Sequence, residues 1–386
     1  MAEDCAQEAC AAALAQWLHD GVPANPGGWL VAVARRRAID HLRREAARVR
    51  KEREAVQHWA AGEPDGTVVA GDDQLALLFA CCHPALDPAA RVPLTLRIVC
   101  GLTIPSIARL LLLTEPTVAQ RIVRAKRKIR DACIRLRVPD PDERQARLVS
   151  VLRVIYLTFT EGHSPHGTDA VVRHDLCDES LRLARGLHRL LPEEPEVSGL
   201  LALILLSAAR SAARVDENGA MVLLPDQDRS RWDRARPAEG RSLAEEALAR
   251  GRAGPYQLQA AIAACHADAS TSAATDWPQI AALYRELLRF DPSPVIEANR
   301  AVAVAYAEGP SAGLRILEAL TASPDLYRWP QLHIARGSLL AQDGRCEDAV
   351  AAYREALLLE PALPIRRHIA DEIAALRGLS APPEET

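Results

Sequence analysis

The sequence is poor in aromatic residues, lysine and methionine. Phe, Trp and Tyr make up 4% of its 386 residues, and it contains two methionines and three lysines, at positions 51, 126 and 128. No stretch rich in Val, Ile and Thr alternates apolar and polar side chains with the period of two that indicates a β-strand. About half of the residues are nevertheless apolar, which is enough to bury cores for two or three domains. We therefore predict an all-α fold.

The sequence also lacks the usual signals for export or membrane insertion. Its first residues, MAEDCAQEAC, are acidic and have neither the basic nor the apolar part of a secretory signal. The most apolar run, Gly199–Ala209, is too short to cross a bilayer. The nine cysteines include no CxxC pair, which is typical of reduced thiols in a cytosolic protein. We predict a cytoplasmic protein that does not enter a membrane.

Histidine and cysteine occur together in two stretches, but neither has the spacing of a tetrahedral metal site. The residues are Cys81, Cys82 and His83, and further along His163, His166, His174 and Cys177. The segment 216–219, DENG, begins like a calcium loop but lacks the later ligands, so we predict a hairpin-like turn there. We predict no metal, no cofactor and no catalytic residue. An enzyme or ligand sensor that uses residues 156–177 is kept as an alternative.

Charge is divided unequally along the chain. Residues 1–137 carry 20 basic and 15 acidic side chains, whereas residues 138–386 carry 27 and 36. All three lysines lie in the first part. We therefore expect the first part, and not the second, to bind a polyanion.

Residues 101–137, GLTIPSIARLLLLTEPTVAQRIVRAKRKIRDACIRLR, predict two short helices joined by a tight turn. Thr103 and Thr114 are suitable N-caps, and Pro105 and Pro116 fall in the first turns, where a missing N–H costs nothing. Apolar residues then recur at helical spacing and give each helix one buried face. On the first helix they are Ile104, Ile107, Ala108 and Leu111, and on the second Val118, Ile122, Ala125 and Ile129.

The second of these helices leads into a dense block of positive charge. Eight Lys or Arg and one acidic residue lie between Arg121 and Arg137. Two capped helices, a short turn and this charge are typical of a helix-turn-helix, in which the second helix enters the major groove. The alternative is an ordinary solvated amphipathic helix.

A second basic helix is predicted near the N-terminus. The helix 2–19 ends at a Pro/Gly/Asn-rich loop, and WLVAVARRRAIDHLRREAARVRKER then repeats apolar residues every four positions. Nine basic and three acidic residues lie between Arg35 and Arg53. An exposed Trp29 could stack on an unpaired base while the arginines hold its phosphates. Alternatively, Trp29 is a core residue and the arginines are solvated.

Three segments in this order resemble the bacterial extracytoplasmic-function (ECF) sigma factors. DCAQEACAAALAQW is similar to the region 2 helix that docks on the clamp of RNA polymerase, and NPGGWLVAVARRRAIDHLRRE to the adjoining segment that reads the −10 element. GLTIPSIARLLLLTEPTVAQRIVRAKRKIR is similar to region 4, which reads the −35 element. The resemblance implies region 2 at 1–50, a flexible linker at 51–73 and region 4 at 74–137.

The resemblance also assigns roles to individual residues and makes core RNA polymerase and promoter DNA the partners. Residues facing the polymerase clamp would be Asp4, Gln7 and Glu8. Residues at the −10 element would be Asn25, Trp29, Arg35, Arg37, Asp40, Arg43 and Arg44. Residues at the −35 element would be Thr114, Glu115, Thr117, Val118, Gln120, Arg121, Arg124, Arg127 and Lys128, with Arg121 and Arg124 the best candidates for base or phosphate contact. Such a protein positions polymerase and is not an enzyme.

The sequence departs from the family pattern in two places. Relatives usually have about one more helix before the point that corresponds to Met1, so region 2 looks truncated, through either a misassigned start or a missing helix. Many relatives place Gly where this sequence has Leu112, which could alter the angle of the turn.

The rest of the chain predicts a separate helical domain. A Pro-rich charged connector at 138–147 precedes helical segments over 148–378. The segments AALYRELLRFDP (281–292) and AAYREALLLEP (351–361) share one pattern within a repeat of about 34 residues. Gly337, Ala349, Ala356 and Pro361 fit the tetratricopeptide (TPR) pattern, which builds a curved solenoid that binds a protein or peptide partner. A generic helical bundle is the alternative.

A subgroup of ECF sigma factors carries a C-terminal extension of this kind, and the whole chain resembles that subgroup. Because the extension is acidic and the first part is basic, we hypothesise that it regulates the sigma factor in cis. The alternative is a helix-turn-helix regulator with a TPR-like interaction domain that does not act with polymerase.

Overall fold

In the computed structural model, the described residues are 73–134, 137–165, 170–217 and 221–379, with the single residues Ala13, Pro23, Pro26 and Val33. The chain divides into one unit of residues 1–69 and 97–101 and a second of residues 70–96 and 102–386. Most of the first unit lies outside the described residues, so the architecture given below is that of the second.

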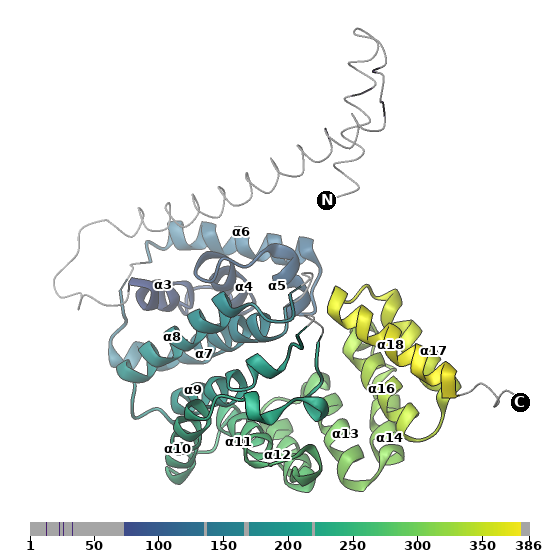
Figure 1. Ribbon diagram of the computed structural model, residues 1–386. Helices are drawn as coiled ribbons and strands as arrows, with labels where there is room; N and C mark the ends of the chain where they lie inside the picture. Colours follow the sequence, from purple (N-terminus) through teal and green to yellow (C-terminus); the bar gives the residue numbers. More distant parts are fainter. Residues whose placement is uncertain are drawn as a thin grey trace, which may run out of the picture. The chain divides into compact units, whose positions relative to one another are not determined.

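The described part of the chain is built of helices, which confirms the all-α prediction (Figure 1). The first four described helices belong to the predicted region 4. They are α3 (Asp73–Cys81), α4 (Pro88–Ile98), α5 (Ile104–Leu110) and α6 (Glu115–Asp131). Helix α3 begins within one residue of the start predicted for region 4.

The next three helices begin the C-terminal domain. They are α7 (Pro141–His163), α8 (His174–Leu190) and α9 (Pro195–Ala208). The predicted connector 138–147 is wrong from Pro141 onward, because α7 begins there. Proline in a first helical turn loses no hydrogen bond and has a helical φ. Pro141 therefore starts a helix, although proline-rich composition suggested a loop.

Helix α9 is apolar around its whole circumference. Together with the 3₁₀ turn that follows, it gives a stretch, Pro195–Ala213, of 19 residues with mean hydropathy 1.4, long and apolar enough to cross a membrane by length and composition. The helical stretch is thus longer than the apolar run seen in the sequence. In the structure 72% of this stretch is buried, and helices α7, α8, α10 and α11 contact α9. It is the central core helix of this domain.

A short irregular segment links α9 to the following helices. It contains the 3₁₀ turns η1 (Ser211–Ala213), η2 (Leu224–Asp226) and η3 (Arg229–Arg231). Val215 and Met221 form an isolated antiparallel bridge, and the N–H of Val222 donates to the carbonyl of Arg214 at 2.8 Å. This pairing brings together the chain on either side of DENG, as the predicted hairpin-like turn requires, and Asn218 and Gly219 themselves lie outside the described residues.

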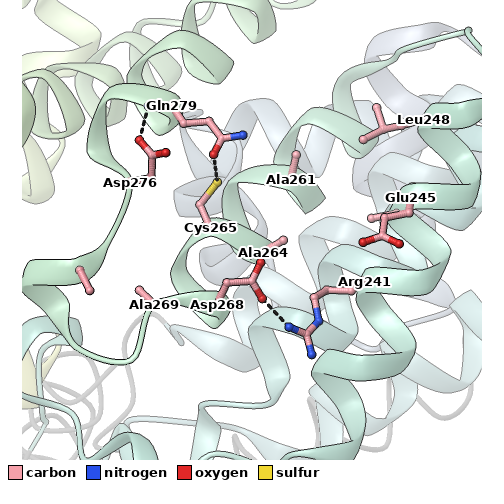
Figure 2. A pocket seen from close by; sticks show the side chains of 12 residues that line it. Arg241, Glu245, Leu248, Ala261, Ala264, Cys265, Asp268, Ala269, Asp276 and Gln279 are labelled. Atoms are coloured by element: carbon pink, nitrogen blue, oxygen red, sulfur yellow. Dashed lines mark hydrogen bonds and ion pairs between the residues drawn. The ribbon is translucent and has the colours of Figure 1, made fainter.

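Three further helices follow, of which α10 and α11 pack against α9 and α12 packs against α11. They are α10 (Ala235–Ala249), α11 (Pro255–Asp268) and α12 (Trp277–Phe290), with the turn η4 (Ser272–Ala274) before α12. A pocket of about 310 Å³ opens between them (Figure 2). Polar groups on its wall bind each other: Arg241 pairs with Asp268 at 2.6 Å, and the Cys265 thiol donates to Gln279 Oε1 at 3.5 Å.

The last helices form antiparallel pairs. They are α13 (Pro294–Glu308), α14 (Pro310–Leu320), the short α15 (Pro324–Tyr327), α16 (Pro330–Gln342), α17 (Cys346–Leu358) and α18 (Leu363–Leu379). Helices α16 and α17 run side by side (Figure 1). A Cβ added at Gly337 would lie 2.7 Å from the Tyr353 ring, and one at Gly313 would lie 2.5 Å from the Ala301 carbonyl. Small residues therefore allow close crossings in both pairs, α16/α17 and α13/α14.

Candidate nucleic-acid interface

The two helices of the helix-turn-helix begin where the sequence predicts. Thr103 caps α5, its hydroxyl accepting the N–H of Ser106 at 3.2 Å. Thr114 caps α6 in the same way, through the N–H of Thr117 at 3.4 Å. Each cap satisfies one of the N–H groups that a helix start leaves without a partner.

The turn between the two helices depends on an unusual backbone at Leu112, whose φ is 51°. The N–H of Leu112 donates to the Arg109 carbonyl at 3.2 Å, and that of Leu113 donates to the Ala108 carbonyl at 2.8 Å. These two bonds form a Schellman motif, which ends a helix with one left-handed residue, usually glycine. The chain therefore makes the turn with leucine in the glycine position.

Helix α6 has one buried face and one exposed cationic face. The predicted seam of Val118, Ile122, Ala125 and Ile129 is buried. The helix ends in a second Schellman-type turn, with Cys133 at φ 46° and the N–H of Ile134 donating to the Ile129 carbonyl at 3.4 Å. The buried seam determines which residues of α6 face solvent.

Most residues predicted to bind the −35 element lie on the exposed side of α6. Thr114, Glu115, Gln120, Arg124, Arg127 and Lys128 are exposed, and Thr117 and Arg121 are partly exposed. Arg130, which was not predicted, extends the cationic face. We name Arg124, Arg127, Lys128 and Arg130 the α6 cationic face. None of these four side chains forms an ion pair with any residue that the structure describes.

Two predicted contacts need correction or qualification. Val118 has no exposed surface, so its inclusion among DNA-contacting residues is wrong, and it belongs to the core that holds α6 in place. Arg121 is partly held by its own domain, because its Nη1 donates to the Ala89 carbonyl at 3.4 Å. Arg121 would have to give up that long hydrogen bond to reach a base.

The residues predicted for the −10 element and the polymerase clamp lie outside the described residues. They are Asp4, Gln7, Glu8, Asn25, Trp29, Arg35, Arg37, Asp40, Arg43 and Arg44. Their roles stay predictions.

The structure shows a contact that the sequence did not predict, between region 4 and the first helices of the C-terminal domain. Helices α3 and α5 contact α7, and α3 also contacts α8. Arg147 of α7 is buried, donating from Nη1 to the Phe79 carbonyl at 3.4 Å and from Nη2 to Glu143 at 2.8 Å. Gln74 of α3 donates to Glu179 and accepts from Arg182 Nη2 at 2.5 Å.

Several of the cysteines and histidines are held by contacts within the fold. Cys82 Sγ lies 3.7 Å from Thr95 Oγ1, and His83 Nδ1 accepts the N–H of Ala85 at 3.1 Å. Burial raises the pKa of Cys177 to about 11, which keeps its thiol protonated near neutral pH. Among the residues described, no group of three His, Cys, Asp or Glu side chains is arranged to hold a metal ion.

Comparison with known families matches both halves of the DNA-binding part. Residues 1–48 match sigma-70 region 2, and residues 76–129 match sigma-70 region 4. The chain belongs to the sigma-70 family. As a sigma factor it binds RNA polymerase and promoter DNA, and α5 and α6 lie within the region 4 match. Sigma factors initiate transcription and are not enzymes.

The helical part of this sigma factor, and the chain as a whole, also have relatives whose function is not stated. Residues 147–248 match a family of unknown function (DUF6596), a match that spans most of α7, all of α8 and α9, and α10 up to Leu248. The chain is also 43% identical over 366 residues to an uncharacterized protein of Rhizobium meliloti (strain 1021), a match that covers 93% of this chain and 86% of the relative. The similarity to that relative therefore includes the sigma regions and the helical domain together.

Proposed function

We propose that the protein is an ECF sigma factor whose region 2 reads the −10 element, whose region 4 reads the −35 element, and whose C-terminal domain regulates it in cis. The observation that carries this proposal is the α6 cationic face, which is exposed on a capped helix-turn-helix within the region 4 match. A helix with these properties fits the major groove and can pair its cations with phosphates.

For the −35 element, position along α6 separates two roles. Residues nearer the N-terminus of a recognition helix reach base edges, and cations further along meet the backbone. We assign Gln120, Arg121 and Arg124 to base edges, and Arg127 and Lys128 to phosphates, with Thr114, Glu115 and Thr117 at the entry of the helix. For the −10 element and the clamp we propose the residues that the family resemblance implies.

For regulation in cis, the contact of α3 with α7 and α8 is the supporting observation. The opposite charges of the two parts motivated the hypothesis of regulation in cis, but the α6 cationic face is exposed. Regulation would instead act through the contacts that α7 and α8 make with α3 of region 4. Region 4 must follow the −35 element on polymerase, so a domain fixed to it would limit or direct that placement.

The C-terminal helices support a TPR-like interaction surface. The pairs α13/α14 and α16/α17 start 36 residues apart, at Pro294 and Pro330. Gly313 and Ala349 occupy the same place in the second helix of each pair, and Leu317 and Tyr353 fill the next inward position. We propose that these repeats bind a protein or peptide partner.

Run-off transcription with purified core polymerase tests the proposal. The full chain should direct initiation at promoters that carry both a −10 and a −35 element. It should do so in the bacterial cytoplasm as well as in vitro. An R124Q variant should lose −35-dependent transcripts, whereas R289Q, at an exposed ion pair on α12, should not. Promoter binding without any transcript would instead support a helix-turn-helix regulator that does not partner polymerase.

A further inference from the structure

Three arginines of the C-terminal domain lie near one another without a carboxylate partner among the residues that the structure describes. Arg210 and Arg214 flank η1, and Arg229 begins η3. Burial, and then the nearby charges of Arg214 and Arg229, lower the pKa of Arg210 to about 10. The positive charge of Arg210 is therefore repelled by the other two guanidinium groups.

Fixed contacts hold two of these guanidinium groups in place. Arg214 Nη1 donates to His163 Nε2 at 3.1 Å. Arg229 Nη1 donates to the carbonyl oxygens of His266 and Ala269, both at 2.6 Å, and its Cζ lies 4.7 Å from the centre of the Trp232 ring. All of these partners are neutral, so the positive charges are oriented but not compensated.

Several donors in this group are buried without an acceptor in the described part of the chain. They include Arg214 Nε, Arg229 Nη2, Trp232 Nε1 and the Nδ1 atom of His163. Because Arg214 donates to Nε2 of His163, the neutral imidazole carries its proton on Nδ1. A buried donor left without an acceptor costs about 1–3 kcal/mol. Acceptor oxygens bound at these N–H groups would remove that cost.

Other arginines of the same domain show what is missing. Arg185 pairs with Glu239 at 2.7 Å, Arg241 with Asp268 at 2.6 Å and Arg250 with Glu193 at 2.8 Å. Within the described ranges, no Asp or Glu forms an ion pair with Arg210, Arg214 or Arg229. Glu161 is buried two residues before His163 and has interactions of its own, but its charge is not among those that shift the pKa of the three arginines.

We propose that Arg210, Arg214 and Arg229 form a binding site for a small anion that carries a phosphate group. Guanidinium forks match the oxygens of a phosphate, and burial makes such charge-assisted hydrogen bonds stronger than at a surface. A doubly charged phosphate would offset most of the mutual repulsion and supply acceptors to the unpaired N–H groups. The shared chemistry is the phosphate, which can come from free phosphate or from a phosphorylated metabolite.

The place of this site in the fold connects it to region 4. His163 lies at the last residue of α7, and Arg147 near the start of the same helix contacts α3. The two residues are sixteen positions apart on one continuous helix, a distance of about 24 Å. The anion site itself needs neither promoter nor polymerase, so it stands or falls independently of the proposed function.

Calorimetry on the full chain tests the proposal, with inorganic phosphate, pyrophosphate and AMP as probes in phosphate-free buffer at constant ionic strength. We expect at least one probe to bind with a Kd below about 1 mM, and R210Q and R214Q to weaken it about tenfold or more. R289Q should bind as the wild type does. Tighter binding of AMP than of free phosphate would indicate a phosphorylated metabolite.

Two further measurements keep the result unambiguous. Without added anion, R210Q should melt at the same temperature as the wild type or higher, because it removes a charge that is repelled by its neighbours. A large loss of melting temperature would show that Arg210 is structural and would overturn the proposal. So would the absence of binding up to about 10 mM of each probe, or loss of binding in R124Q, which would place the anion on the α6 cationic face.

Discussion

At the scale of single residues, Leu112 carries a conformational cost within the DNA-binding motif. A left-handed backbone costs a residue with a Cβ about 1–2 kcal/mol, and glycine is free of that cost. The side chain of Leu112 is 42% exposed, so it recovers little by burial. The helix-turn-helix is therefore less stable than the same turn made with glycine.

We predict that L112G stabilises region 4 by about 1 kcal/mol. Hydrogen exchange of the α5 and α6 amides should slow about fivefold, with no change in α16 and α17. L112A keeps the Cβ and should not slow exchange. Faster exchange in L112G would mean that contacts of the leucine side chain outweigh the backbone strain.

Two buried histidines predict how stability responds to acid. Burial, then the charges of Arg214 and Arg210, hold the pKa of His163 well below 6.5, and burial, then Arg210 and Arg229, lower that of His266 to about 4. The unfolded chain binds protons on these imidazoles at higher pH than the folded chain does. Their contribution to stability is therefore complete above about pH 6.5 and is lost as the pH falls towards 4.

We accordingly expect the melting temperature to fall between pH 6.5 and pH 4 in phosphate-free buffer. Carboxylates also titrate there, so the informative quantity is the difference between variants. H266Q should show a shallower fall than the wild type, whereas H368Q, on α18, should not differ. Equal slopes in wild type and H266Q would contradict the assigned pKa.

At the scale of elements, local signals in the sequence were sufficient for α5 and α6. Thr103, Thr114 and the prolines after them specify helix starts through backbone chemistry that needs no tertiary structure. The same rule, applied to Pro141, would have predicted the start of α7 correctly. The Pro-rich composition of residues 138–147 suggested a connector instead. Val118 was assigned to both the buried seam and the DNA, and helical periodicity allows only the first.

For α6 we predict different outcomes at Arg124 and at Lys128, one helical turn further along. R124A should weaken binding to a −35 duplex by about 1–3 kcal/mol and relax preference at one base pair, if it contacts a base. K128A should weaken binding equally for all sequences and reduce the slope of log K against log salt by about 0.9. Fluorescence anisotropy at several salt concentrations separates the two cases. A uniform loss for R124A would assign that residue to a phosphate.

R109A on α5 is the control for these two variants. Arg109 is exposed and precedes the turn, so its removal tests whether any exposed cation of the helix-turn-helix matters for binding. We expect R109A to bind the −35 duplex nearly as the wild type does. A loss as large as that for R124A would contradict a specific role for α6.

At the scale of the whole molecule, long-range contacts were beyond the sequence. Arg210, Arg214 and Arg229 lie in one group with His163 and His266, although the two histidines are about a hundred positions apart in the sequence. No local sequence pattern connects these five residues. The contact between α3 and α7 is equally non-local. Each residue of these groups looks like a solvated cation or a core histidine by itself, and only packing reveals the missing acceptors and the buried Arg147.

The contact of Arg147 with region 4 allows a decisive test of regulation in cis. R147A removes the hydrogen bonds to Phe79 and Glu143 and leaves a cavity beside α3, so it should cost about 1–3 kcal/mol locally. Hydrogen exchange in α3 should become about tenfold faster, and the yield of run-off transcript should change. R153A, at an exposed position of the same helix, should alter neither. If α3 exchanges faster in R147A while transcription stays the same, the C-terminal domain does not control the sigma factor through this contact.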